Sequence, residues 1–230
     1  MSQKPTFDYD YIVIGSGAGG SPAASILASA GKKVAVVEKS TFGGESPNWG
    51  DVPTGFMSYT INTYQIAKNA AKFGLRTNSV GYNYPSLLSW KDVVTRRTGA
   101  GGNRRYYEKQ GISVFTGNAH FLSPNEIAIN RRHLSARKFL IATGSDWQIP
   151  KIPGLENTIY HTPKTIFNLK RLPKTIFVMG SSTAALELAH IFSVLGTKVY
   201  IAEESSRILP NFDEEVSNLL TNDAKKNRNI

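Results

Sequence analysis

The sequence predicts an α/β protein in which one strand–turn–helix–strand unit occurs twice. The stretch Asp8–Lys39 passes from an apolar run through a glycine-rich turn and a helix of small residues to a second apolar run. Ile176–Glu204 repeats this order at a constant offset, so that Gly15 aligns with Gly180. Two such units in one chain predict two successive domains of the same type.

The turn of the first unit carries glycines in the G-x-G-x-x-G spacing. A β-branched strand at 11–14 leads into Gly15, Gly17 and Gly20. The first glycine permits a tight turn, the second lets the backbone approach a pyrophosphate, and the third lets helix and strand pack closely. This order predicts a dinucleotide site. A glycine-rich turn in another kind of α/β protein is the alternative.

A helix and a second strand complete this unit. Ser21–Ala30 is predicted to be helical, with Pro22 in the first turn, where a missing N–H is tolerated. The free N–H groups and the positive dipole end at its N-terminus suit phosphate oxygens. The strand at 33–37 ends on Glu38, whose carboxylate can accept the ribose hydroxyls of an adenosine half.

The second unit departs from the glycine pattern at one position. Gly180 keeps the first glycine, Ser182 replaces the second, and Ala185 is an accepted variant of the third. Ser182 adds a Cβ where the backbone should approach phosphate, although its hydroxyl is able to compensate. Glu203 ends the second strand and favours NAD over NADP, because a carboxylate repels a 2′-phosphate. The unit is interpreted as a nicotinamide nucleotide site.

The segment between the two units is predicted to begin with helices and to continue with short strands. Helices are expected from Pro53 towards Gly74 and over 85–110, the second interrupted by glycines at 98–103. Short strands follow from Ile112 and end in a buried strand at 138–142.

A tight turn and a linker follow the last of these strands. Thr143, Gly144 and Ser145 form the turn, and a proline- and glycine-rich linker occupies 150–154. The linker predicts two domains, 1–149 and 150–230.

Composition excludes several classes of protein. No apolar run approaches the roughly 18 residues of a membrane span, and residues 1–9 lack the apolar core of a signal peptide, so a cytoplasmic protein without a membrane contact is expected. The net charge is +10, but the basic residues are scattered in pairs, which favours a solvated surface, or one that attracts anionic cofactors, over a nucleic-acid site. The sequence has no cysteine and four histidines without ligand spacing, so neither a disulfide nor a metal site is expected.

These motifs resemble the pyridine nucleotide–disulfide oxidoreductases, a family that includes dihydrolipoamide dehydrogenase, glutathione reductase and mercuric reductase. The matching segments are the glycine turn at 15–20, GGESPNWGDVPT at 43–54, the Ala-Thr-Gly turn at 142–144 and the second motif at 180–187. The second motif is most similar to the mercuric reductase branch. The resemblance implies a Rossmann-like FAD-binding domain of three layers (ββα), followed by the first part of a second Rossmann domain for NAD(P).

The resemblance also assigns residues to the two cofactors. The FAD site would comprise Gly15, Ser16, Gly17, Ala18 and Gly20 at the pyrophosphate, Glu38 at the ribose with Lys39 as a further cofactor-binding residue, and Gly44, Ala119, Thr143 and Gly144 around the adenine and flavin. Gly180, Ser182 and Glu203 would face the nicotinamide nucleotide. Glu187 matches a glutamate that in the family pairs with a lysine beside the flavin N5.

The sequence departs from the family where the chemistry takes place. Two cysteines that form the family's redox dithiol are replaced by Ser46 and Asp51, neither of which can form a thiolate. The lysine expected after the second of these is Gly55, which leaves Glu187 without that partner. Disulfide reductase activity is therefore not expected, and no residue is assigned a catalytic role. The Asp51 carboxylate would also disfavour an anionic reduced flavin.

The resemblance further implies that the chain is truncated. It ends where the third strand of the second domain would begin, before the family's later FAD segment, its dimerisation domain and its catalytic His–Glu pair. His120, His133, His161 and His190 are not candidates for that base.

Three hypotheses remain open. The first is a flavoprotein oxidoreductase that passes hydride from NAD(P)H through FAD to a non-disulfide acceptor. The second is a non-catalytic or split-chain subunit that needs a separate C-terminal chain. The third is a deliberately shortened, cysteine-substituted form of a working reductase.

Overall fold

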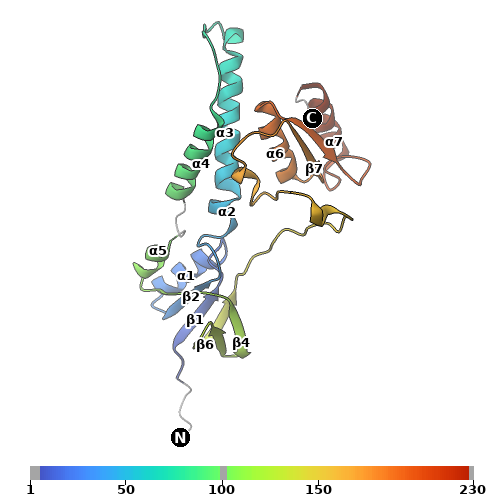
Figure 1. Cartoon of the computed structure of the whole chain (residues 1–230). Coiled ribbons are helices and arrows are strands. Elements are labelled where there is room, and N and C mark those ends of the chain that lie inside the picture. Colours follow the sequence, from blue (N-terminus) through green and yellow to red (C-terminus); the bar gives the residue numbers. More distant parts are fainter. Residues whose placement is uncertain (1–5, 99–102, 228–230) are drawn as a thin grey trace. The chain divides into compact units, whose positions relative to one another are not determined.

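A computed structural model of the chain describes residues 6–98 and 103–227 (Figure 1). The chain divides into two compact units. Unit 1 comprises residues 1–52 and 95–154, and unit 2 comprises residues 53–94 and 155–230.

The division between the units near residue 154 falls at the linker recognised in the sequence. The helical segment 53–94, however, belongs to unit 2, although it lies within the predicted N-terminal domain. Each compact unit is therefore formed by two separate segments of the chain rather than by one continuous segment. The assignment of an FAD domain to 1–149 and an NAD(P) domain to 150–230 stays a prediction.

Unit 1 is built on a six-stranded sheet with the order β3-β2-β1-β6-β5-β4. Its strands are β1 (Tyr9–Ile14), β2 (Val34–Glu38), β3 (Ser113–Thr116), β4 (Ala119–Ser123), β5 (Glu126–Ile129) and β6 (Arg132–Ile141). The first four strands in this order run parallel, while β5 and β4 continue from β6 as an antiparallel meander. Parallel neighbours require crossover connections, and the α-helices provide them.

β6 belongs to both parts of this sheet. Its first residues pair antiparallel with β5, and from Ala136 onward it pairs parallel with β1. The predicted separate, buried strand at 138–142 is thus the second half of one ten-residue strand, and Leu140 and Ile141 are 38% and 65% exposed. Leu140 lies beside Val13 on the face that the helices cover, and it is exposed because α1 (Gly20–Ser29) packs on β1 and β2 and α5 (Arg104–Glu108) on β3. Ile141 points to the opposite face of the sheet.

The parallel strands of unit 1 are covered on both faces. Val13, Val34 and Val36 point into a core that α1 and α5 close with Ala24 and Tyr107. On the opposite face, residues of β1 and β2 pack against the folded-over meander; the buried members of this core are Ile12, Ala35, Val37, Ile127, Ile129, Leu134 and Ala136. Burial on both faces explains why the strand sequences are nearly all apolar. The helix layer, the parallel layer and the meander confirm the predicted three-layer fold.

Unit 2 combines long helices with a second strand–helix–strand unit. Its main elements are α3 (Asp51–Lys68, which begins in unit 1), α4 (Tyr84–Thr98), β7 (Thr175–Met179), α6 (Thr183–Val194), β8 (Lys198–Ala202) and α7 (Glu214–Asn227). Short helices lie at α2 (Glu45–Asn48) in unit 1 and, as 3₁₀ turns, at Ala70–Phe73, Leu155–Asn157 and Ile166–Asn168. α3 and α4 account for the predicted helices, and residues 99–102 of the predicted interruption lie outside the described residues.

The helices of unit 2 share one apolar core with the second strand–helix–strand unit. Met57 and Ile61 of α3 and Leu88 of α4 lie in it with Phe192 of α6 and Val199 of β8. α3 and α4 run beside each other along this core (Figure 1). The register of five residue pairs from Thr175↔Lys198 to Met179↔Ala202 shows that β7 and β8 are parallel, as the repeat of the first unit predicts.

One face of the β7–β8 sheet lacks a cover. Ile176 and Val178 face the core, whereas Phe177, Met179 and Tyr200 are 64%, 48% and 45% exposed. Parallel sheets in proteins are normally buried on both faces. This face is therefore an apolar surface on which further structure can pack.

The described residues give no sign of a membrane span or of a metal centre. No helix within 6–98 and 103–227 is long and apolar enough to cross a membrane. Nor do three or more His, Asp or Glu side chains gather as potential metal ligands in that part of the chain. His133 Nδ1 lies 3.0 Å from Glu126 Oε1 on the meander surface, where it packs as an ordinary surface residue.

Candidate dinucleotide-binding sites

The glycine turn after β1 has no room for side chains at two of its positions. Gly15 has a φ of +99°, and a Cβ there would lie 2.2 Å from the Ala142 carbonyl oxygen. A Cβ on Gly20 would lie 1.9 Å from the Gly15 carbonyl oxygen. Both contacts are far inside van der Waals distance, so the turn can close over the strand ends only with glycine. α1 begins at Gly20, and its Ser21 N–H donates to the Gly17 carbonyl at 3.0 Å.

The backbone of this turn also passes close to the loop before α2. A Cβ on Gly44, where φ is +69°, would lie 2.7 Å from the Gly17 Cα. The Asn48 side chain holds this loop by donating to the carbonyl oxygens of Phe42 and Gly44 at 2.9 and 2.7 Å. Gly17 and Gly44 therefore meet as two bare backbones, and Ala18 beside them is exposed.

Glu38 is held by two serines. Ser16 donates both its backbone N–H (3.0 Å) and its hydroxyl (2.6 Å) to Oε2, and the Ser40 N–H donates to Oε1 at 2.9 Å. A carboxylate oxygen accepts about two hydrogen bonds. Oε2 is thus filled, whereas Oε1 retains room for one more donor, which fits one ribose hydroxyl. Lys39 follows as an exposed residue at the end of the strand.

The second unit repeats this arrangement at its own acid. Ser181 donates its N–H (3.0 Å) and its hydroxyl (2.5 Å) to Glu203 Oε2, and the Ser205 N–H donates to Oε1 at 3.0 Å. The Ser181 hydroxyl bond and the Ser205 and Ser181 backbone bonds hold the pKa of Glu203 below its ordinary value. The carboxylate is therefore charged at neutral pH and, like Glu38, retains one acceptor position on Oε1.

Sequence reasoning did not find this role for the serines. Ser16 was assigned to the pyrophosphate, yet its N–H and hydroxyl both point to Glu38. Ser40, Ser181 and Ser205 were not singled out. The signal was present in the repeat, because Ser16 aligns with Ser181 and Ser40 with Ser205 at the offset that relates the two glutamates.

The turns of the two units differ at the second glycine. Ser182 is the N-cap of α6, and its hydroxyl accepts a hydrogen bond from the Ala185 N–H at 3.3 Å. That hydroxyl serves the helix end and not an open phosphate position. Gly180 keeps a positive φ of +85°, but no atom lies within 4 Å of where its Cβ would be. The second turn is thus more open than the first.

The remaining predicted FAD residues lie around the same strand ends of unit 1. The Ala142 N–H donates to the Ile14 carbonyl at 2.8 Å, which places the turn with Thr143 and Gly144 against the Gly15 turn. Next to Glu38, the Gly117 N–H donates to the Glu38 carbonyl at 2.9 Å, and Ala119 opens β4 two residues later. The turn at 15–20, the acid and these two segments therefore converge on one edge of the sheet.

Ser46 and Asp51 stand where the family carries its redox cysteines. The Ser46 hydroxyl donates to Asp51 Oδ2 at 3.1 Å, and Asp51 is the first residue of α3. A carboxylate in the first turn of a helix is stabilised by the helix dipole. A polar contact thus joins the two positions, without any group that can be reversibly oxidised.

Glu187 of α6 has a partner that the sequence did not indicate. The Ser58 hydroxyl donates to Glu187 Oε1 at 2.6 Å. Ser58 lies one helical turn after Gly55 on α3, so it reaches the glutamate from near the position of the family's lysine. The partner is neutral, which leaves the carboxylate without the cation that the resemblance leads one to expect.

Each of the two units thus combines a glycine turn with a terminal carboxylate that a serine holds in place. The family model described as "Pyridine nucleotide-disulphide oxidoreductase" matches residues 9–230. The chain belongs to the pyridine nucleotide-disulphide oxidoreductase family.

Curated relatives agree with this assignment. The chain is 32% identical over 225 residues to a mercuric reductase of Bacillus cereus, with 96% of this chain and 35% of the relative covered. It is 34% identical over 214 residues to a dihydrolipoyl dehydrogenase of Acholeplasma laidlawii, with coverage of 91% and 63%. A glutathione reductase of Burkholderia cepacia is 34% identical over 220 residues, with coverage of 96% and 48%. The chain thus spans about a third to two thirds of the length of these relatives.

Two solved structures share the fold. Both are Cu(II) complexes of the HOCl-induced flavoprotein disulfide reductase RclA from Escherichia coli, one of them a cysteine mutant. Their TM-scores are 0.84 and 0.82 at 24% sequence identity, with 97% and 95% of this chain and 48% and 47% of those chains covered.

Proposed function

We propose that this chain is the nucleotide-binding part of an FAD-dependent oxidoreductase that takes hydride from NAD(P)H and does not use a protein dithiol. The observation that carries the proposal is the combination of the glycine turn and serine-held Glu38 of the first unit with the Ser46–Asp51 hydrogen bond at the cysteine positions. The isoalloxazine ring of FAD accepts and donates electrons itself, so the acceptor need not be a disulfide. A quinone or oxygen is the acceptor class consistent with this chemistry.

The residues of the first site fit FAD. The bare backbones of Gly17 and Gly44 allow a pyrophosphate to approach, and the N-terminus of α1 supplies a positive dipole end. Glu38 would accept one adenosine ribose hydroxyl at Oε1, the oxygen that retains an acceptor position. Ser16 would keep the carboxylate in that orientation.

The second site supports NAD over NADP. Glu203 is ionised at neutral pH, because its hydrogen bonds lower its pKa. A charged carboxylate accepts a ribose hydroxyl and repels a 2′-phosphate. Binding of NADH is therefore expected to be tighter than binding of NADPH.

A non-catalytic or split-chain subunit is the second candidate, and one observation favours it. The exposed Phe177, Met179 and Tyr200 leave one face of a parallel sheet uncovered. A separate C-terminal chain that packs on this face would bury them. In this case, the protein would bind nucleotides alone but would transfer hydride only with that partner.

An absorbance spectrum of the purified protein, taken before and after anaerobic NADH, tests the proposal. A flavin band that is bleached by NADH is the expected result. A flavin band that persists would favour the non-catalytic candidate, and the absence of flavin even after reconstitution with FAD would contradict FAD binding by this chain.

A double cysteine variant tests whether reduction of the flavin by NADH depends on the residues at positions 46 and 51. Ser46→Cys/Asp51→Cys places two thiols at side chains that already touch, so a disulfide is expected under oxidising conditions. NADH should reduce the flavin of the parent protein and of this variant, whereas thiols should appear only in the variant. Ser46→Ala/Asp51→Ala is the matched control.

A further inference from the structure

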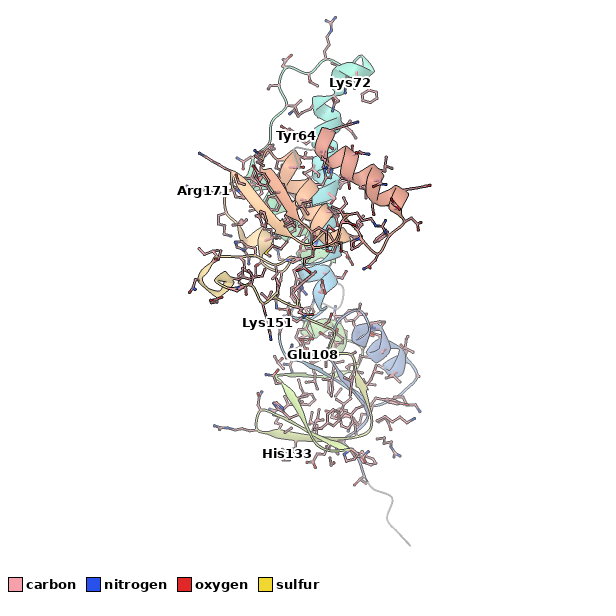
Figure 2. All side chains as sticks on the ribbon, turned by 90° about the vertical axis from the view of Figure 1, so that its right-hand side faces the viewer. Tyr64, Lys72, Glu108, His133, Lys151 and Arg171 are labelled. Carbon is pink, nitrogen blue, oxygen red and sulfur yellow. The ribbon has the colours of Figure 1, made fainter. Side chains whose placement is uncertain are left out.

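A groove runs along the outer edge of β3 in unit 1. It consists of two adjoining hollows of about 380 and 500 Å³ that share Arg104, Val114, Phe115 and Arg132. Arg131 also lines the larger hollow. Glu108 on α5 and His133 on β6, labelled in Figure 2, mark the two elements from which the arginines extend.

This groove is distinct from the dinucleotide sites. The residues that line it belong to α5, β3 and the β5–β6 turn. The glycine turn, Glu38 and Gly44 are not among them. It is therefore a second concave surface of unit 1.

The groove is closed to an added peptide strand. The Gly117 N–H bonds to the Glu38 carbonyl, so by strand alternation the carbonyls of Val114 and Thr116 face outward. Both already accept side-chain donors: Arg104 Nη2 binds the Val114 oxygen at 3.1 Å, and Asn130 Nδ2 binds the Thr116 oxygen at 3.2 Å. An approaching strand would have to displace both. The backbone N–H groups of the same two residues point to the same outward side.

The position of the arginine pair is set by a tight turn. Asn130 has a φ of +55° and starts the two-residue connection between β5 and β6. Its side-chain amide is packed against Gly117, where a Cβ would lie 2.8 Å from Nδ2. The bond from Asn130 to the Thr116 oxygen thus ties this turn, with Arg131 and Arg132, to the edge of β3.

The groove carries an excess of positive charge. Arg104 Nε pairs with Glu108 at 2.6 Å, which offsets one of its three guanidinium groups. Among the described residues, no carboxylate lies within 4 Å of Arg131 or Arg132. Guanidinium groups bind phosphate through paired N–H donors. The groove therefore combines two arginines that have no carboxylate partner with the outward N–H groups of Val114 and Thr116.

We propose that this groove binds a chain of adjacent phosphoryl groups, such as a free polyphosphate or the phosphate tail of a nucleotide. The four residues of β3 extend over about 10 Å at roughly 3.3 Å per residue, with arginines at both walls, which suits a linear anion better than a single phosphate. The site is independent of the proposed oxidoreductase activity.

Isothermal titration calorimetry of the full chain with sodium tripolyphosphate tests the proposal. One binding event is expected at low salt, and orthophosphate should bind more weakly. Arg131→Ala/Arg132→Ala should weaken binding by about tenfold or more, since each charge-assisted hydrogen bond contributes at least about that factor. Arg96→Ala/Arg97→Ala, which removes an exposed pair of equal charge from the end of α4, is the matched control and should change the affinity little.

Additional measurements distinguish the forked geometry of arginine from its positive charge and identify the type of ligand that carries the phosphate chain. Arg131→Lys/Arg132→Lys should bind with intermediate affinity, because lysine keeps the charge but loses the fork; it also serves if the alanine variant fails to fold. ATP that binds with the same arginine dependence would identify a nucleotide tail, whereas binding of tripolyphosphate alone would identify a free polyphosphate.

Four results would overturn the proposal. The first is the absence of tripolyphosphate binding at low salt. The second is an equal loss in both arginine-pair variants, which would indicate bulk charge. The third is displacement of tripolyphosphate by excess FAD, which would place the anion in the dinucleotide site. The fourth is equally tight binding of octaglutamate, which would indicate an acidic peptide rather than a phosphate chain.

Discussion

The two serine-held acids are alike, whereas the turns beside them are not. In each unit a serine hydroxyl donates to the glutamate and accepts a backbone N–H from the loop that follows, from Gly43 at 3.3 Å in unit 1 and from Leu209 at 3.0 Å in unit 2. The first turn is enclosed, with Ala142 against Gly15, while the space beside Gly180 is open. The comparison shows that the strand–helix–strand unit itself orients its carboxylate, and that the surrounding structure decides how tightly the phosphate turn is closed.

The largest expected difference between the two turns concerns their first glycine. Gly15→Ala combines a positive φ with a clash at 2.2 Å, so a loss of about 3 kcal/mol or more in the free energy of unfolding is expected. Gly180→Ala has the same backbone strain without a clash and should cost about 1–2 kcal/mol. Urea unfolding of both variants measures this. Equal losses would show that the first turn relaxes as easily as the second.

The next largest difference in stability is expected between variants of Ser16 and Ser181, the serines that hold the two acids. Ser16→Ala removes the hydroxyl that satisfies the buried Glu38, and a loss of about 1–3 kcal/mol is expected from the unsatisfied groups. Ser181→Ala should cost less, because Glu203 is more accessible to water. Thermal unfolding of both variants, with Ser193→Ala on α6 as a control serine, tests the order. A larger loss in Ser181→Ala would contradict it.

The pH dependence of stability tests the contribution of the Ser181 hydrogen bond to Glu203. Its pKa in the folded protein lies below the ordinary value of 4.5, chiefly because of the Ser181 hydroxyl. A depressed pKa stabilises the folded state above the unfolded value, and this contribution is lost as the pH falls through the folded value. The difference in unfolding free energy between wild type and Ser181→Ala should therefore shrink as the pH is lowered from 7 to 3.5. A constant difference over that range would rule out this linkage.

The smallest effect on stability is expected at Ser182. Ser182→Gly restores the glycine of the first turn and should cost only a few tenths of a kcal/mol, whereas Ser182→Ala loses the N-cap and should cost about 1 kcal/mol. If the Cβ limits phosphate approach, NADH should bind more tightly to the glycine variant alone. Fluorescence titration with NADH compares the two, and equal affinities would show that the Cβ does not obstruct the nucleotide.

Local patterns predicted most of the fold because they act over short distances. The glycine spacing and the terminal acid of each unit depend on residues within about 30 positions of one another, and the second unit repeats the pattern of the first. β6 was predicted incorrectly because its two halves pair with different strands, and an apolar run does not specify its partners. The exposure of Leu140 follows from the extent of the helical layer, which no local pattern records.

The sequence by itself determined the two strand–turn–helix–strand units, the acid at the end of each and the loss of thiol chemistry at Ser46 and Asp51, because residue type and spacing are sufficient for these. Only the tertiary structure showed which side chains from distant segments form hydrogen bonds with these units. Ser58 reaches Glu187 across 129 positions of sequence, and the edge of β3 meets the Asn130 turn through side-chain hydrogen bonds. Such contacts depend on how distant segments pack together, and packing is a property of the whole chain rather than of any one segment.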